Sequence, residues 1–208
     1  MKKGLFIVFE GIDGSGKTTQ ADLLASSLSD GGYGVLVTRD PGGTALGEGL
    51  RNVLLYGAGP VDPVAEALLY GAARAQLVAE RIIPALKTGS VVICDRFADS
   101  MTAYQGAGKG LDRGFLEGIN TYACMGLEPE ITILLDIDPS MALARLTRPA
   151  DRMEREGIEF LQRVRKGYLD MAGRNPGRYL VIDGSMPAQK MFPLIRSAVN
   201  RLLEERWV

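Results

Sequence analysis

The sequence contains no histidine and very little cysteine, and both absences exclude chemistry. Without histidine the chain cannot build Ser-His or Cys-His catalytic pairs or an HExxH zinc site, and it lacks imidazole for acid–base work. The two cysteines, Cys94 and Cys124, are too far apart for a CxxC motif and too few for a disulfide framework. This cysteine usage is typical of a reducing compartment.

An excess of basic charge is also missing. Lys and Arg number 24 and Asp and Glu number 25, so the formal net charge is −1 and we expect no nucleic-acid or membrane partner. No apolar run is long enough to cross a bilayer. Lys2 and Lys3 before the apolar run Leu5–Phe9 imitate the start of a secretion signal, but Glu10 ends that run too early and no cleavage site follows. We therefore expect a cytoplasmic protein.

Short apolar runs without polar alternation predict strands that are buried on both faces, as in parallel sheets. Helical patterns lie between them, which predicts an α/β fold with a five-stranded parallel sheet flanked by helices. The length of 208 residues suits a single domain, 1–208. The runs are Leu5–Phe9, Val35–Val37, Val91–Cys94, Ile131–Leu135 and Tyr179–Ile182.

Apolar residues at steps of three and four predict the helices. A second helix signal is Asp62 as a cap with Pro63 at the first position, and its pattern runs on to Pro84. Glycine and proline clusters at 41–43, 57–60 and 106–110 predict loops, and the charged stretch 147–157 predicts a mobile excursion. The other helices are marked by Ala21, Leu24 and Leu28, by Ile158, Leu161, Val164, Tyr168 and Met171, and by Met191, Ile195, Val199 and Leu202.

A phosphate-binding loop follows the first predicted strand. Gly11 to Thr18 match GxxxxGK[ST], and a predicted helix comes next. Glycines let the backbone N–H groups turn toward an anion, and the helix points its positive end at it. Lys17 would then meet the β- and γ-phosphates, and Thr18 would supply a hydroxyl to Mg²⁺. The candidate ATP-binding residues here are Gly11, Ile12, Asp13, Gly14, Ser15, Gly16, Lys17, Thr18 and Thr19.

Arginines at the ends of strands predict a second phosphate site. Of the 24 basic residues, 17 are arginine, whose fork matches phosphate oxygens. Arg39 follows the second predicted strand and Arg96 the third, at the sheet edge where open α/β folds bind ligands. Two phosphate sites suit phosphoryl transfer between nucleotides. Asp95 is the first candidate for the carboxylate near Mg²⁺, through water, and Asp136 at the end of the fourth strand is the second.

From Phe9 to about Asp183 these residues resemble the thymidylate kinase family, of the bacterial type. The P-loop is shared by many families, whereas the PGGT and AYQG segments are more specific. Departures are Asp40, where the family more often has Glu, Tyr70, where it more often has Phe, and a lid a few residues short. The matching segments are FEGIDGSGKTT from Phe9, TRDPGGT from Thr38, LLYGAARAQ from Leu68, DRF from Asp95 and AYQG from Ala103.

The resemblance implies a P-loop nucleoside monophosphate kinase fold with a short lid, and transfer of a phosphoryl group from ATP with Mg²⁺ to dTMP, giving dTDP and ADP for dTTP synthesis. It also implies a homodimer. For the acceptor it implies that Asp13 contacts the sugar 3′-hydroxyl, that Tyr70 stacks on thymine and that Tyr104 crowds the position of a ribose 2′-hydroxyl. The remaining implied dTMP contacts are Arg39 and Arg96 to the phosphate, Arg74 to a thymine carbonyl and Gln105 to the base edge.

The lid is expected at about 145–157. The bacterial type carries a catalytic arginine there, and P-loop positions 12–15 hold no Arg or Lys that could replace it. Arg148 is the first candidate and Arg152 the second, and Arg145 is expected beside the adenine together with the loop Asp183–Pro187. The expected catalytic set is Lys17, Asp95, Arg96 and Arg148.

Two other interpretations stay open at this point. A kinase for another pyrimidine monophosphate or for a deoxynucleoside would use the same P-loop, although Tyr104 and Gln105 favour thymidylate. A regulatory P-loop ATPase would bind ATP without a phosphate acceptor, but it would have no use for Arg39, Arg74 and Arg96.

Overall fold

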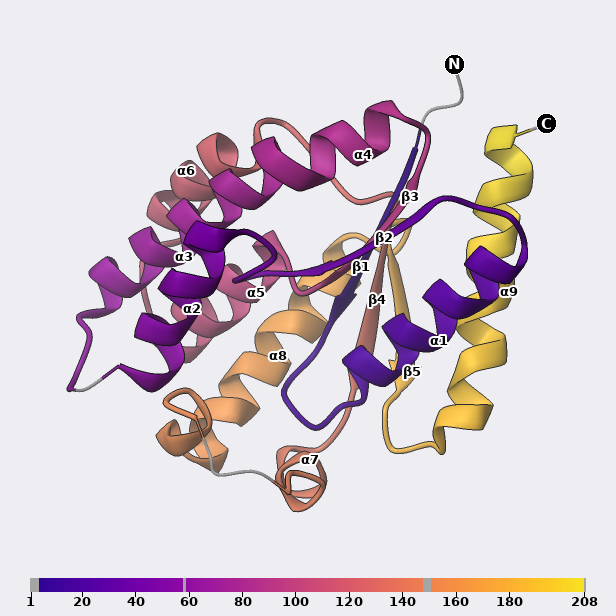
Figure 1. Ribbon diagram of the computed structural model, residues 1–208. Coiled ribbons are helices and arrows are strands. Elements are labelled where there is room, and N and C mark those ends of the chain that lie inside the picture. The colour runs from indigo at the N-terminus through magenta and orange to yellow at the C-terminus, as the bar shows by residue number, and fades with distance from the viewer. Residues whose placement is uncertain (1–3, 58, 148–150, 208) are drawn as a thin grey trace.

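The computed structural model describes residues 4–57, 59–147 and 151–207, and a parallel sheet lies at its centre (Figure 1). The sheet order is β2-β3-β1-β4-β5, and every pairing is parallel. The five-stranded parallel sheet predicted from the apolar runs is therefore confirmed. Its strands are β1 (Leu5–Glu10), β2 (Val35–Arg39), β3 (Val91–Asp95), β4 (Ile131–Asp136) and β5 (Tyr179–Asp183).

The prediction that the strands are buried on both faces is confirmed for the middle of the sheet and is wrong for its two edge strands. Every residue of β1 is buried, whereas Val37 of β2 and Val181 of β5 are 44% and 46% exposed. An edge strand has a partner on one side only, and helices cover it incompletely. Each apolar run also extends to a polar residue at its carboxyl end, which brings Glu10, Arg39 and Asp95 to one edge of the sheet.

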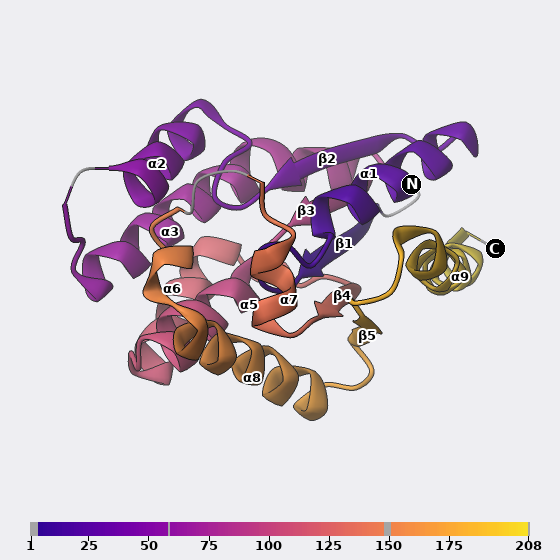
Figure 2. The same ribbon diagram turned by 90° about the horizontal axis from the view of Figure 1, so that it is seen from below.

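Helices cover both faces of the sheet (Figures 1 and 2). On one face, α1 (Lys17–Asp30) and α9 (Ala188–Trp207) pack on β1 and its neighbours through Leu24, Ile195 and Val199. The other face is covered by α3 (Pro63–Leu77), α6 (Arg113–Cys124) and α8 (Ile158–Arg174). Further elements are α2 (Ala45–Tyr56), α5 (Ala98–Met101), α7 (Pro139–Ala144) and the 3₁₀ turn η3 (Glu154–Glu156).

The helix that begins after Asp62 is confirmed, and it runs past Pro84. Asp62 caps α3 by accepting the N–H of Val64 at 2.9 Å, with Pro63 at the first position. The chain continues through the π-helical segment η1 (Val78–Ile82) into α4 (Ile83–Lys87). A wider turn before a proline frees the carbonyl that the ring would otherwise meet, which lets the helical path continue.

The predicted loop at 106–110 is wrong over its first half. Residues Thr102–Gly108 form a second π-helical segment, η2, which packs on α8. A Cβ at Gly108 would lie 2.6 Å from the ring of Phe160, and one at Gly167 would lie 2.6 Å from the side chain of Ala107. The glycines therefore serve close helix packing here.

The stretch 147–157 is also more ordered in its second half than its charge suggested. Asp151, Met153 and Glu154 are buried, and η3 forms within it. Residues 148–150 lie outside the described residues. Among the described helices, none is long and apolar enough to cross a membrane.

Candidate active site

The loop between β1 and α1 has the backbone of a phosphate cradle. Gly11, Gly14 and Gly16 have φ values of 135°, 82° and 98°, which side chains with a Cβ rarely adopt. A Cβ at Gly14 would also meet the carbonyl oxygen of Ala142. The hydroxyl of Ser15 is buried and has no hydrogen-bond partner among the described residues. A concave loop of N–H groups and an unpaired hydroxyl at a helix N-terminus suit an anion.

Lys17, Thr18 and Asp95 meet beside this loop. The Lys17 ammonium donates to the carbonyl of Ile12 at 2.9 Å and lies 3.6 Å from Asp13, and burial lowers its pKa. The Thr18 hydroxyl donates to Asp95 Oδ2 at 2.7 Å. A hydroxyl and a carboxylate beside a phosphate cradle are the oxygen donors that Mg²⁺ prefers. The residues therefore fit a magnesium-bound nucleotide.

The second candidate for that carboxylate is engaged elsewhere. Arg165 of α8 holds Asp136 with two hydrogen bonds, from Nε at 2.6 Å and Nη2 at 2.9 Å. Asp136 therefore ties α8 to the end of β4. Asp95 is the candidate that contacts Thr18, and its role beside Mg²⁺ stays a prediction.

A cavity opens next to the phosphate cradle and gathers most of the expected acceptor residues. It lies between α2, α3, η2 and the segment after 150. Tyr70 and Tyr104 bring aromatic rings to it, and burial raises the pKa of both hydroxyls, which keeps them neutral. Its lining consists of Asp13, Asp40, Pro41, Arg51, Leu55, Tyr70, Arg74, Arg96, Ser100, Met101, Tyr104, Gln105 and Met153.

Arg96 joins the phosphate cradle to this cavity. Its Nη2 donates to Asp13 at 2.8 Å and to the Tyr104 hydroxyl at 3.0 Å, and its Nη1 donates to the Tyr168 hydroxyl at 3.2 Å. The residue has a φ of 71°, in the left-handed region. Strained backbone conformations of this kind cluster at active sites and ligand-binding sites.

Arg39 lies in a neighbouring cavity instead. Its side chain is 52% exposed and pairs with Glu48 at 2.7 Å. That cavity also contains Thr18, Asp95 and Arg96, so Arg39 lies on the approach to the predicted phosphates. Arg51 of α2 lines both cavities and donates to the carbonyl of Pro41 at 3.0 Å, and no sequence pattern pointed to it.

Arg74 is the most deeply placed of the expected acceptor residues. It is 1% exposed and pairs with Asp40, while its Nη2 donates to the carbonyl of Phe97 at 3.2 Å. Its Nη1 bonds to Asn120. The Asp40 carboxylate that departs from the family pattern is thus the counter-ion of Arg74. Arg74 lines the cavity and also locks α3 to the end of β3.

A buried carboxylate behind Arg96 was missed by the sequence analysis. Glu10 is fully buried and accepts the N–H of Phe97 at 2.8 Å, the Ser100 hydroxyl at 2.6 Å and the Tyr168 hydroxyl at 2.8 Å. Burial, and then the nearby Asp99, raise the pKa of Glu10 to about 7. The only signal in the sequence was a polar residue at the end of an apolar run.

This raised pKa predicts a stability that falls with pH. The folded state keeps the Glu10 proton to about pH 7, whereas the unfolded chain releases it near the ordinary value of 4.5. Stability is therefore lost as pH rises through that window. Against Glu10→Gln, which cannot ionise, we expect the wild type to lose about 3 kcal/mol between roughly pH 4 and pH 8. Urea unfolding of both proteins across this range measures it, and parallel pH curves would contradict it.

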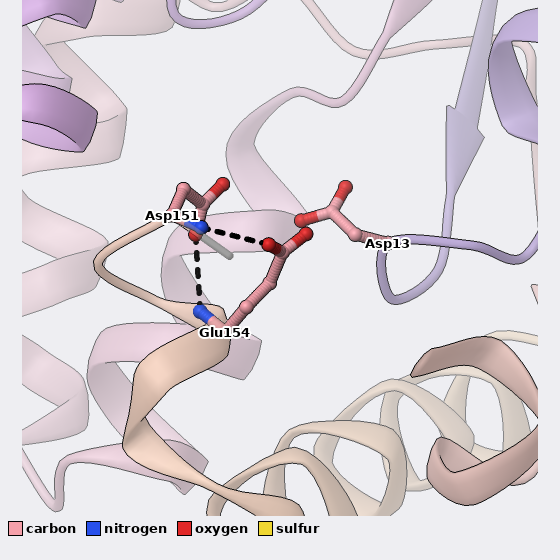
Figure 3. A group of neighbouring side chains, drawn as sticks. All are labelled: Asp13, Asp151 and Glu154. Atoms are coloured by element: carbon pink, nitrogen blue, oxygen red, sulfur yellow. Dashed lines mark hydrogen bonds between the residues drawn. The ribbon is translucent and has the colours of Figure 1, made fainter. Parts of the chain in front are cut away.

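Carboxylates gather where the segment after 150 meets the phosphate cradle. Figure 3 shows Asp13 facing Asp151 and Glu154, and oxygens of all three lie within 4.8 Å of one another. Asp151 accepts the N–H groups of Met153 and Glu154 at 2.9 and 3.0 Å, and Glu154 accepts that of Asp151 at 2.8 Å. This part of the expected lid is therefore folded against the loop that contains Asp13.

The described lid arginines, Arg145 and Arg152, make different contacts. Arg148 lies outside the described residues. Arg152 pairs with the buried Glu66 and donates to the carbonyl of Leu54 at 2.7 Å. Arg145 donates to the carbonyls of Gly184 and Ser185 at 2.7 and 3.1 Å. It lines a third cavity over Gly14 to Gln20, together with Met186, Pro187 and Ala188. Arg145 and the loop Asp183–Pro187 therefore lie together beside the phosphate cradle, and their place at the adenine stays a prediction.

These features define a class of protein. A parallel α/β sheet carries a phosphate cradle after its first strand, a hydroxyl–carboxylate pair beside it, and a second cavity bridged to it by Arg96. Phosphate-binding sites at the carboxyl edge of such a sheet are typical of P-loop nucleotide-binding proteins.

The comparisons identify the family within that class. Residues 9–195 match the family model described as thymidylate kinase. The thymidylate kinase of Pelotomaculum thermopropionicum is 54% identical over 97% of this chain and 95% of its own length. That of Deinococcus radiodurans is 47% identical over 96% of this chain and 98% of its own. A crystal structure of thymidylate kinase from Ehrlichia chaffeensis is 38% identical, with a TM-score of 0.76, over 97% of this chain and 99% of that one. The chain belongs to the thymidylate kinase family.

Proposed function

We propose that this chain transfers the γ-phosphoryl group of ATP to dTMP, giving ADP and dTDP for the synthesis of dTTP. Family membership over nearly the whole chain supports this reaction. The observation that carries it is the bridge made by Arg96, which links the phosphate cradle to a cavity lined by Tyr70, Tyr104 and Gln105. We infer that residues 1–208 act as one catalytic domain.

The charge distribution suggests how the donor is held. Lys17 neutralises the β- and γ-phosphates from a buried position, where its charge acts in a low dielectric. Thr18 and Asp95 would hold Mg²⁺, the aspartate through water, and the bound ion would neutralise and align the phosphates. Arg145 borders the adenine in the cavity that it shares with Pro187.

The acceptor is held from several sides. Arg96 and Arg39 bind its phosphate, and Asp13 contacts the sugar 3′-hydroxyl while also positioning Arg96. Tyr70 stacks on the thymine, with Arg74 one helical turn further along the same face, toward a base carbonyl. The transition state spreads charge over the transferred oxygens, so alignment and positive charge supply the catalysis. Arg148 of the lid adds the last positive charge, and a closed lid excludes water.

Tyr104 is the residue that we expect to exclude ribonucleotides. Its hydroxyl is fixed by Arg96 at 3.0 Å, and its ring packs edge-on against Phe160 and Tyr168 with centroids 6.1 and 6.3 Å away. A ring packed against two other rings cannot yield to an additional 2′-hydroxyl, because close-packed side chains do not shift at low cost. The ring therefore acts as a steric filter.

A panel of acceptors tests the reaction and this filter together. ADP formation from MgATP is measured with dTMP, dUMP, UMP, CMP, AMP and thymidine, each offered alone. We expect strong dependence on dTMP and weak activity with UMP. In Tyr104→Ala the preference for dUMP over UMP should fall by about 10-fold, as expected for the loss of one packed contact in a binding pocket. ADP formation that ignores every acceptor would overturn the proposed reaction.

We further propose that the protein is a homodimer and works in the cytoplasm, without a nucleic-acid or membrane partner. The family resemblance supports the dimer, and α2, α3 and α6 expose Val53, Leu68 and Tyr122, at 49%, 52% and 86%. Two buried free cysteines suit a reducing compartment. Light scattering after size exclusion would give the mass, and a monomer at micromolar concentration would contradict the dimer.

A further inference from the structure

Glu66 is a buried carboxylate that contacts Gln105 behind the lining of the acceptor cavity, and none of the roles described above uses it. It is 0% exposed and lies one helical turn before Tyr70 on α3. A carboxylate buried this deeply needs partners that repay its desolvation. Those partners come from other elements, and they differ between its two oxygens.

One carboxylate oxygen of Glu66 contacts two cationic side chains, and the other accepts a hydrogen bond from a side-chain amide. Oε2 accepts from Lys109 at 3.0 Å and pairs with Arg152. Oε1 accepts from Gln105 Nε2 at 2.7 Å. An ionised carboxylate accepts and never donates, so the atom of Gln105 that faces it must be the NH₂ group.

The orientation of the Gln105 amide follows from this contact. Its Nε2 is committed to Glu66, and its Oε1 has no hydrogen-bond partner within the described part of the chain. The side chain is 2% exposed and lines the acceptor cavity. The oxygen is therefore the polar atom that Gln105 offers to a ligand, and the cavity presents a hydrogen-bond acceptor at this point.

We propose that Glu66 is a positioning residue that sets base specificity: it fixes the Gln105 amide so that its oxygen accepts a hydrogen bond from a pyrimidine ring N–H. Thymine and uracil carry a hydrogen on N3, whereas N3 of cytosine has a lone pair. Cytosine would place two acceptors against each other, and a buried polar atom without a partner is costly. This inference rests on the proposed function, because it takes the cavity as the site of the acceptor base.

Glu66→Gln should reverse the orientation of the Gln105 amide, and not only weaken the hydrogen bond that holds it. Lys109 and Arg152 both require an oxygen at the Oε2 position, so the new amide must place its NH₂ group toward Gln105. Gln105 must then turn its own oxygen to that NH₂ group, which leaves its NH₂ group facing the cavity. Thymine N3–H would meet a donor, and cytosine N3 would meet a suitable partner.

The test compares dTMP with dCMP as acceptors for ADP formation. In E66Q we expect kcat/KM for dTMP to fall by about 10- to 100-fold, mainly through KM, while dCMP is unchanged or improves. In the double variant E66Q with Q105E, a carboxylate oxygen again faces the cavity. The ratio of dTMP to dCMP should then return to within about threefold of the wild type. K109M is the matched control, since it removes one cation and leaves the carboxylate, and its ratio should not change.

Each outcome decides one question. If E66Q loses activity equally with dTMP and dCMP, the role of Glu66 is only structural, and the proposal is overturned. If E66Q does not fold, the double variant E66Q with Q105E decides the question, because it keeps one buried carboxylate. A preserved ratio of dTMP to dCMP activity, together with higher stability than Q105E alone, supports the proposal. A lost ratio overturns it. A wild type that forms no ADP in response to dTMP rejects the proposed function instead, whatever the variants do.

Discussion

Lys17→Met is expected to lower kcat by about 10²- to 10³-fold, the loss that follows removal of one preorganised charge or donor from a transition state. Lys17 is 5% exposed, and its ammonium is held by the carbonyl of Ile12 at 2.9 Å and by Asp13 at 3.6 Å. A charge fixed in this way needs no reorganisation when the transferred phosphoryl group becomes more negative. Methionine keeps the length of the side chain and removes only the charge.

Steady-state kinetics with dTMP and MgATP measure this effect, and melting curves separate it from unfolding. Burial lowers the pKa of Lys17, which means that the charge is desolvated, so its loss should not lower the melting temperature. The exposed Lys87 at the end of α4 supplies the matched control, because Lys87→Met removes the same charge far from the cavities. If Lys17→Met keeps a turnover within about tenfold of the wild type, Lys17 does not belong to the catalytic set.

Arg148→Ala is expected to lower turnover by about 10³-fold while the KM for dTMP changes little, because an arginine supplied to a phosphoryl transition state typically contributes this much. The P-loop contains no Arg or Lys at positions 12–15, so we expect the lid to provide this charge. A group that acts only in the transition state lowers kcat and kcat/KM equally. Single-turnover measurements with dTMP would confirm that the chemical step is affected.

The two other lid arginines act as comparison variants, since their contacts predict different defects. Arg152 pairs with Glu66 and with the carbonyl of Leu54, so Arg152→Ala should mainly lower stability. Arg145 holds the carbonyls of Gly184 and Ser185, so Arg145→Ala should mainly raise the KM for ATP. Full turnover in Arg148→Ala, with a large loss in one of these variants, would move the catalytic role to that arginine.

Much of the fold and the donor site could be predicted from the sequence because the signals are local. An apolar run without alternation predicts a buried strand, and all five such runs are strands. The P-loop pattern lies within ten consecutive residues, and its lysine and threonine could be assigned from spacing alone. The end of a strand also indicated Asp95 as a carboxylate near the phosphate cradle, and its Oδ2 accepts the Thr18 hydroxyl at 2.7 Å.

Other features depend on distant residues and had no such signal. The predicted loop at 106–110 is half helical because Gly108 makes room for Phe160, which is more than fifty residues away. The charged segment after 150 is partly buried because Arg152 finds Glu66 on α3. The roles assigned to Tyr70, Arg74, Tyr104 and Gln105 came from resemblance, and the structure brings all four to one cavity.

The sequence by itself determined the strands, the phosphate cradle and the family of this protein, since hydrophobic period and short motifs depend on neighbours along the chain. Only the tertiary structure decided how the carboxylates are used. Glu10 became the partner of Tyr168 and Ser100, and Glu66 became the anchor of Gln105. A charged residue can be buried only where donors from other elements surround it, and no local pattern specifies which elements will meet.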